Sequence, residues 1–144
     1  MQIKETILKD CFVITPDVHK DGRGYFMETY RQSWTDALGK LTDEFVQDNQ
    51  SLSHYGTIRG LHIQTGEHAQ AKLVRVVSGK ILDVAVDLRK ESLTFGEHIS
   101  VELSAENNRQ LWIPKGFAHG FSVLSTEAVV CYKCDAYYNK ESES

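Results

Sequence analysis

Short strand-like runs recur along almost the whole of this 144-residue chain. They are rich in Val, Ile, Tyr and Phe, and Gly, Asn, Asp and Ser separate them. Many short strands with little helix predict an antiparallel all-β sandwich or jelly roll. We expect strands at residues 11–14, 24–30, 44–50, 57–64, 71–77, 80–88, 97–103, 110–113, 119–124 and 128–134. One short helix is expected over 33–41, with Ser33 as its N-cap.

Length and charge limit the class of protein. A chain of this length suits a single domain over 1–144. The net charge of -4 argues against a general nucleic-acid binder, and the apolar runs are too short to span a membrane. The N-terminus has no apolar signal sequence. An odd number of cysteines (Cys11, Cys131 and Cys134) fits a reducing compartment, so we expect a cytoplasmic protein.

Ser78 and Gly79 separate two strand-like runs and predict a two-residue hairpin turn. The hairpin register would make Lys72 and Asp83 diagonal neighbours that can pair. Alternation then assigns one partly charged face to a cavity lining, namely Lys72, Val74, Val76, Ile81, Asp83, Ala85 and Asp87. The other face is assigned to the ordinary core, and its apolar row also suggests a dimer contact: Leu82, Val84, Val86 and Leu88. The alternative for the charged face is a solvated surface with an ion pair.

Two glycine-flanked histidines resemble the motifs of the cupin fold. Gly56 precedes His62 by six positions, as in the first cupin motif, and the Pro-x4-His spacing that ends at His119 resembles the second. Gln64 stands where metal cupins have a second His, and Lys72 stands where they have a Glu. A protonated lysine repels a cation and has no free lone pair. We therefore expect no metal, which disfavours a metal-cupin oxygenase.

Without a metal, these residues suit proton exchange beside a ketone. A neutral imidazole can act as a base, and an ammonium such as that of Lys72 can stabilise an enolate oxygen. Tyr132 can return a proton from the opposite side. Arg59 would join His62 on one face if Gly60 hosts a β-bulge, and would otherwise point outward. The alternative for each His is a hydrogen-bonded core residue.

Five segments, in order, resemble dTDP-4-dehydrorhamnose 3,5-epimerases: 21–28 (DGRGYFME), 45–53 (FVQDNQSLS), 58–64 (IRGLHIQ), 71–89 (AKLVRVVSGKILDVAVDLR) and 112–124 (WIPKGFAHGFSVL). The resemblance implies a cupin jelly-roll barrel with His62 as base, Tyr132 as acid and Lys72 near the sugar C4 oxygen. It implies that the remaining site residues bind the substrate and its nucleotide: Arg23, Glu28, Gln47, Asn49, Arg59, His119, Tyr138 and Glu143. Tyr138 is similar to an aromatic residue that packs on thymine.

The resemblance also implies a metal-free homodimer, without a cofactor, whose N-terminal segment reaches the partner's site. Its substrate would be dTDP-4-keto-6-deoxy-D-glucose, and its product dTDP-4-keto-L-rhamnose. In the family, the Asp that pairs with the base His lies in a segment beyond the part that this chain matches. We therefore expect the His62 imidazole to be poorly oriented and turnover to be slow. We expect Asp83 to be the carboxylate nearest to His62. The alternatives are a C3-only epimerase and a catalytically weak dTDP-sugar-binding relative.

Overall fold

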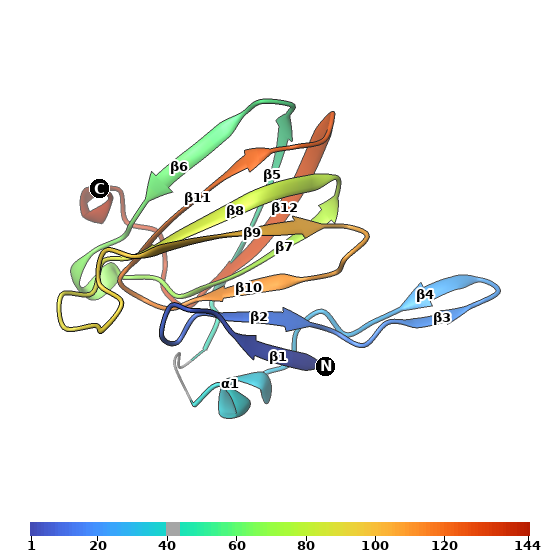
Figure 1. Cartoon of the computed structure of the whole chain (residues 1–144), viewed down its shortest axis with the longest axis horizontal. Helices are drawn as coiled ribbons and strands as arrows, with labels where there is room; N and C mark the ends of the chain where they lie inside the picture. Colours follow the sequence, from blue (N-terminus) through green and yellow to red (C-terminus); the bar gives the residue numbers. More distant parts are fainter. Residues whose placement is uncertain (40–43) are drawn as a thin grey trace.

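Two antiparallel sheets face each other in the computed structural model, which describes residues 1–39 and 44–144 (Figure 1). The six-stranded sheet has the order β1-β2-β10-β7-β12-β5, and the four-stranded sheet has the order β6-β11-β8-β9. The larger sheet contains β1 (Gln2–Glu5), β2 (Phe12–Thr15), β5 (Gln47–His54), β7 (Lys72–Ser78), β10 (Gln110–Ile113) and β12 (Glu127–Cys134). The smaller contains β6 (Ile58–His62), β8 (Lys80–Asp87), β9 (His98–Ser104) and β11 (Phe117–Val123). This arrangement confirms the predicted all-β jelly roll.

The main core fills the space between the sheets. Val74 and Val76 of β7 contribute to it from one side, and Ile81, Ala85 and Phe121 from the other. A second apolar cluster contains Leu73 and Trp112 of the larger sheet, together with Trp34. Trp34 begins the helix α1 (Trp34–Ala37), and the described residues also form the short helical turns η1 (Gly66–His68) and η2 (Lys140–Ser142).

The helix α1 lies where a helix was predicted but is shorter within the described residues. Ser33 precedes it without forming the expected side-chain cap. The last two residues of the predicted range, 40 and 41, lie outside the described residues.

The predicted hairpin between β7 and β8 is wrong, because the two strands lie in different sheets. After Gly79 the chain crosses between the sheets, where the Lys80 amide donates a hydrogen bond to Ser125 Oγ. Val74 therefore lies opposite Leu111 and Tyr132 instead of Asp83. Alternation along each strand still holds, so Val74 and Asp83 both face the interior. The face of Leu82, Val84 and Val86 is the half-buried outer side of the four-stranded sheet and not the core.

A hairpin arm extends away from the two main sheets (Figure 1). It consists of β3 (His19–Asp21) and β4 (Gly24–Phe26), which form a separate two-stranded sheet. The strand expected at 24–30 is therefore shorter, while β1 and β3 were not predicted. Tyr25 and Phe26 on the arm are both about two-thirds exposed, at 68% and 67%.

Candidate active site

A cleft with a volume of about 460 Å³ opens between the edge strands of the two sheets, β5 and β6. Its lining includes Arg59, His62, Lys72, His119 and Tyr132. An adjoining hollow of about 350 Å³ shares His62, Lys72 and Tyr132 with the cleft. The hollow adds further predicted site residues, namely Gln47, Tyr138 and Glu143, and Asn49 lines both. Residues that are far apart in sequence therefore surround one space.

A β-bulge explains how Arg59 and His62 reach the same cleft. His62 lies opposite His119, and Arg59 lies opposite Phe121, so β6 has one more residue than β11 between these pairs. The extra residue confirms the predicted bulge. Gly60 lies within it at φ 106°, and a Cβ there would approach Gly120 Cα and the His119 carbonyl oxygen to 2.7 Å. Only glycine fits this close contact without displacing the backbone.

His62 has a carboxylate neighbour that the sequence did not indicate. Glu143 Oε1 lies 3.1 Å from His62 Nδ1, and Glu143 Oε2 accepts a hydrogen bond of 2.7 Å from the Tyr138 hydroxyl. This hydrogen bond raises the pKa of Tyr138. The backbone holds the end of the chain beside β6, because Gln64 and Glu143 form a β-bridge. The expectation that Asp83 is the carboxylate nearest to His62 is wrong.

Asp83 instead forms a buried pair with the second histidine. Its Oδ1 atom lies 2.6 Å from His119 Nε2, and both side chains are almost fully buried. The expected ion pair between Asp83 and Lys72 is wrong, because within the described residues Asp83 pairs with His119 and not with Lys72. Asp83 Oδ2 is buried without a hydrogen-bond partner in the described part of the chain.

Lys72 and Tyr132 face each other on the wall formed by the six-stranded sheet. Lys72 Nζ lies 5.5 Å from the centre of the Tyr132 ring. Burial lowers the pKa of Lys72, since removal from water disfavours the ammonium form. Burial raises the pKa of Tyr132, so its phenol keeps its proton at neutral pH.

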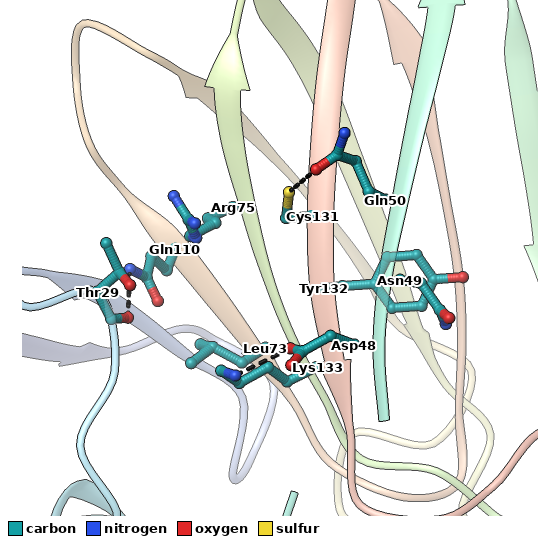
Figure 2. Close-up of a pocket in the computed structure, with 10 residues that line it drawn as sticks. All are labelled: Thr29, Asp48, Asn49, Gln50, Leu73, Arg75, Gln110, Cys131, Tyr132 and Lys133. Atoms are coloured by element: carbon teal, nitrogen blue, oxygen red, sulfur yellow. Dashed lines mark hydrogen bonds and ion pairs between the residues drawn. The ribbon is translucent and has the colours of Figure 1, made fainter. Parts of the chain in front are cut away.

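Strand alternation places the polar side chains of β5 on two opposite faces of the sheet. Gln47 and Asn49 form a side-chain hydrogen bond of 3.0 Å, and the Gln47 Oε1 atom accepts a hydrogen bond from the Tyr138 backbone. Figure 2 shows Tyr132 and Asn49 pointing away from Arg75 and Gln110, which line a hollow on the outer side of the sheet. Asp48 also lies on that side and pairs with Lys133.

The same alternation separates the cysteines of β12. Cys131 lines the outer hollow, whereas Cys134 is buried, and both are free thiols. Strand positions three apart point to opposite faces of the sheet, so these two thiols are not placed to form a redox pair.

Two predicted nucleotide-binding residues lie outside the cleft of their own chain. The Arg23 side chain, on the arm, is 92% exposed and pairs with Asp21 at 2.7 Å. Glu28 pairs with Arg31 at 3.6 Å and lines a different hollow together with Met1 and Trp34. The structure of one chain therefore does not bring these two residues to the other site residues.

Arg59 has a positioning partner that sequence reasoning missed. Its Nε atom donates a hydrogen bond of 2.7 Å to Ser53 Oγ, which links edge strand β6 to edge strand β5. Within the described ranges, no carboxylate forms an ion pair with Arg59, so its positive charge is available to the cleft. A serine six positions earlier gave no sequence signal for this contact.

The comparisons with known proteins point to one family. The family model described as dTDP-4-dehydrorhamnose 3,5-epimerase matches residues 5–144. A relative with that name from Shigella flexneri is 52% identical, over 99% of this chain and 79% of its own length. The crystal structure of dTDP-4-dehydrorhamnose 3,5-epimerase from Elizabethkingia anophelis is similar with a TM-score of 0.95 and 57% identity, over 99% of this chain and 78% of that one. A Legionella pneumophila dTDP-6-deoxy-D-glucose-3,5-epimerase, solved with dTDP-4-keto-L-rhamnose, has a TM-score of 0.94 and 49% identity, over 99% of this chain and 75% of that one.

Proposed function

Because the chain belongs to the dTDP-4-dehydrorhamnose 3,5-epimerase family, we propose that its cleft inverts C3 and C5 of dTDP-4-keto-6-deoxy-D-glucose to give dTDP-4-keto-L-rhamnose. The observation that carries the proposal is the meeting of three groups in one cleft. A histidine, a lysine and a tyrosine line it from three different strands: His62, Lys72 and Tyr132. These are the base, the oxyanion stabiliser and the acid that proton exchange beside a ketone requires.

The position of the base and the acid suits inversion. His62 belongs to the four-stranded sheet and Tyr132 to the six-stranded sheet, so they lie on opposite walls of the cleft. His62 removes the proton from the carbon next to the C4 ketone, and the electron pair moves onto the C4 oxygen. The Lys72 ammonium stabilises that oxygen. Tyr132 then donates a proton to the carbon from the other face, which inverts the centre.

The rest of the cleft suits the nucleotide end of the substrate. Arg59 supplies a positive charge for the diphosphate, and His119, held by Asp83, donates or accepts a hydrogen bond at its free ring nitrogen. Gln47, Asn49 and the half-exposed ring of Tyr138 are suited to the thymidine. Amides match the polar edge of a base, and an aromatic ring stacks on its face.

Replacing Arg59 by alanine is expected to weaken dTDP binding by roughly tenfold or more, because charge-assisted hydrogen bonds contribute about 1.5–3 kcal/mol. Titration calorimetry with dTDP measures the change. Arg109→Ala is the matched control, since Arg109 is exposed near β2 and lines none of the cleft. Equal affinities for wild type and Arg59→Ala would remove Arg59 from the nucleotide site.

A homodimer is the second part of the proposal, in which the arm of each subunit completes the cleft of its partner. The arm of β3 and β4 forms a separate two-stranded sheet, and isolated hairpins of this kind are only marginally stable in water. It bears exposed Tyr25 and Phe26 next to the unburied Arg23. The half-buried row of Leu82, Val84 and Val86 adds an apolar surface that a second copy can cover.

Sedimentation at micromolar concentration should therefore give the mass of a dimer. Mixed dimers provide a sharper measurement. Arg23→Ala chains and Arg59→Ala chains each have weakened sites, but one site of a mixed dimer combines both wild-type arginines. Unfolding and refolding the two variants together should thus restore some tight dTDP binding. A monomer, or a mixture that binds no better than its components, would contradict the shared site.

We place this reaction in the cytoplasm. All three cysteines are free thiols, which suits a reducing compartment. In the described part of the chain, no helix is long and apolar enough to cross a membrane.

Incubation with dTDP-4-keto-6-deoxy-D-glucose tests the proposed activity. NMR spectra of the sugar should show a new dTDP-linked 4-keto sugar with inverted C3 and C5 centres. Inversion at C3 without C5 would identify a C3 epimerase instead. Recovery of unchanged substrate at stoichiometric enzyme would contradict the proposal.

A further inference from the structure

We propose that Ser53 is a positioning residue, whose hydroxyl oxygen orients the Arg59 guanidinium toward a diphosphate in the cleft without cancelling its positive charge. The ligand part of this inference rests on the proposed function, in which Arg59 binds the diphosphate of dTDP. The orientation of Arg59 is a property of the protein without ligand and can be measured separately.

The hydrogen bond joins an exposed cation to a buried hydroxyl. Arg59 Nε donates to Ser53 Oγ at 2.7 Å, and Ser53 is only 3% exposed, whereas Arg59 is exposed. Ser53 lies opposite the buried Ala128 of β12, on the inward face of β5. A long exposed side chain has many accessible rotamers, and fixing it costs conformational entropy. The buried oxygen therefore gives the Arg59 side chain a fixed point of attachment.

The contacts to β5 use one edge of the guanidinium and leave the other edge for an anion. Besides the bond from Nε to Ser53, the Nη2 atom of Arg59 donates a long hydrogen bond of 3.5 Å to the Leu52 carbonyl oxygen. The edge that carries Nε and Nη2 thus faces β5. Nη1 and the second N–H of Nη2 remain as donors in the cleft that Arg59 lines. Two such donors form a fork that matches two phosphate oxygens.

A serine orients the arginine without neutralising it. A hydroxyl accepts a hydrogen bond but has no charge, whereas a carboxylate in the same place would form an ion pair. Arg89 shows that second arrangement, because Asp10 and Asp87 both pair with it at 3.0 Å. Among the residues that the structure describes, no carboxylate pairs with Arg59. Its orientation is therefore fixed while its charge remains available to an anionic ligand.

The backbone of the cleft walls is held without the Ser53 side chain. The strands β5 and β6 are edge strands of different sheets, and a short turn joins them. In this turn the Thr57 amide donates to the His54 carbonyl oxygen at 3.0 Å, and the Val123 amide donates to the Thr57 carbonyl oxygen at 3.0 Å. Replacing Ser53 by alanine therefore removes the hydroxyl and leaves the two walls in place.

A double-mutant cycle, measured by titration calorimetry with dTDP, tests this role. Ser53→Ala should weaken dTDP binding by about two- to tenfold, because a free arginine side chain must then be immobilised when the ligand binds. In the Arg59→Ala background the same substitution should have no effect. Ser53→Asp should bind dTDP no better than Ser53→Ala, since its carboxylate would cancel the charge of Arg59. In the ligand-free protein, NMR should show slow hydrogen exchange at Arg59 Nε, and Ser53→Ala should accelerate it.

Ser100→Ala is the matched control, because Ser100 is an exposed serine of β9 and lines none of the cleft. It should leave the dTDP affinity, the exchange at Arg59 Nε and the melting temperature unchanged. Equal affinities for wild type and Ser53→Ala would overturn the inference. An equal loss in the presence and absence of Arg59 would overturn it as well, since Ser53 would then act on the cleft in general. If wild type binds no dTDP while exchange at Arg59 Nε still depends on Ser53, the proposed function fails and the orienting role stands.

Discussion

Replacing His62 by alanine should slow deuterium exchange into the substrate by about 10²–10⁴-fold, which is the usual contribution of a general base. A proton beside a ketone is weakly acidic, and its removal requires a positioned acceptor. His62 lies at the end of β6 with its side chain 57% exposed, so it is accessible to a ligand in the cleft. The His119 side chain is only 6% exposed, and its Nε2 atom is engaged by Asp83. Exchange is measured by NMR in D2O.

Tyr132→Phe provides the contrasting variant. It removes the phenolic proton and keeps the ring beside Lys72. Inversion should fall sharply while proton removal by His62 is largely preserved, so that exchange exceeds product formation. Undiminished exchange in His62→Ala would show that another residue is the base.

Replacing Lys72 by methionine should lower kcat by about 10²–10³-fold, as expected when one preorganised oxyanion stabiliser is lost. Lys72 begins β7 and is half-buried in the cleft. In such a site its positive charge acts on the C4 oxygen with less screening than in water. Methionine keeps a similar length and removes the charge, and steady-state kinetics measures the change.

The lowered pKa of Lys72 gives this prediction a pH dependence. The ammonium is the form that stabilises the oxygen, and it is lost as pH rises through the pKa of Lys72. Activity should therefore decline at a lower pH than it would with a lysine of ordinary pKa. Lys80→Met is the control, because Lys80 pairs with Glu102 outside the cleft. Equal kcat values for wild type and Lys72→Met would contradict the assigned role.

Local patterns in the sequence predicted much of the fold. Alternation with period two assigned Val74 and Asp83 to the interior even though the hairpin that was used to align them does not exist. A one-residue mismatch in spacing between Arg59 and His62, next to Gly60, predicted the bulge that the structure contains. Both inferences depend on a few neighbouring residues, for which backbone geometry is decisive.

Long-range pairing could not be predicted in the same way. The Ser78-Gly79 turn is compatible with a hairpin. However, β7 pairs with β10 and β8 pairs with β11, so the two strands lie in different sheets. This crossing separates Lys72 from Asp83 and leaves Asp83 beside His119. The contact between His62 and Glu143 joins residues more than half the chain apart, and no local pattern specifies it. Arg23 on the arm and Glu28, which follows the arm, show a further limit, since one chain does not bring them to the cleft.

The positions of deuterium in the product test the central claim most directly, because enolate chemistry exchanges each carbon-bound proton that it inverts. The wild-type protein is incubated with dTDP-4-keto-6-deoxy-D-glucose in D2O, and the product is analysed by NMR and mass spectrometry. The account predicts deuterium at both C3 and C5. An inverted product that retains its original protons at both carbons would contradict proton abstraction by His62.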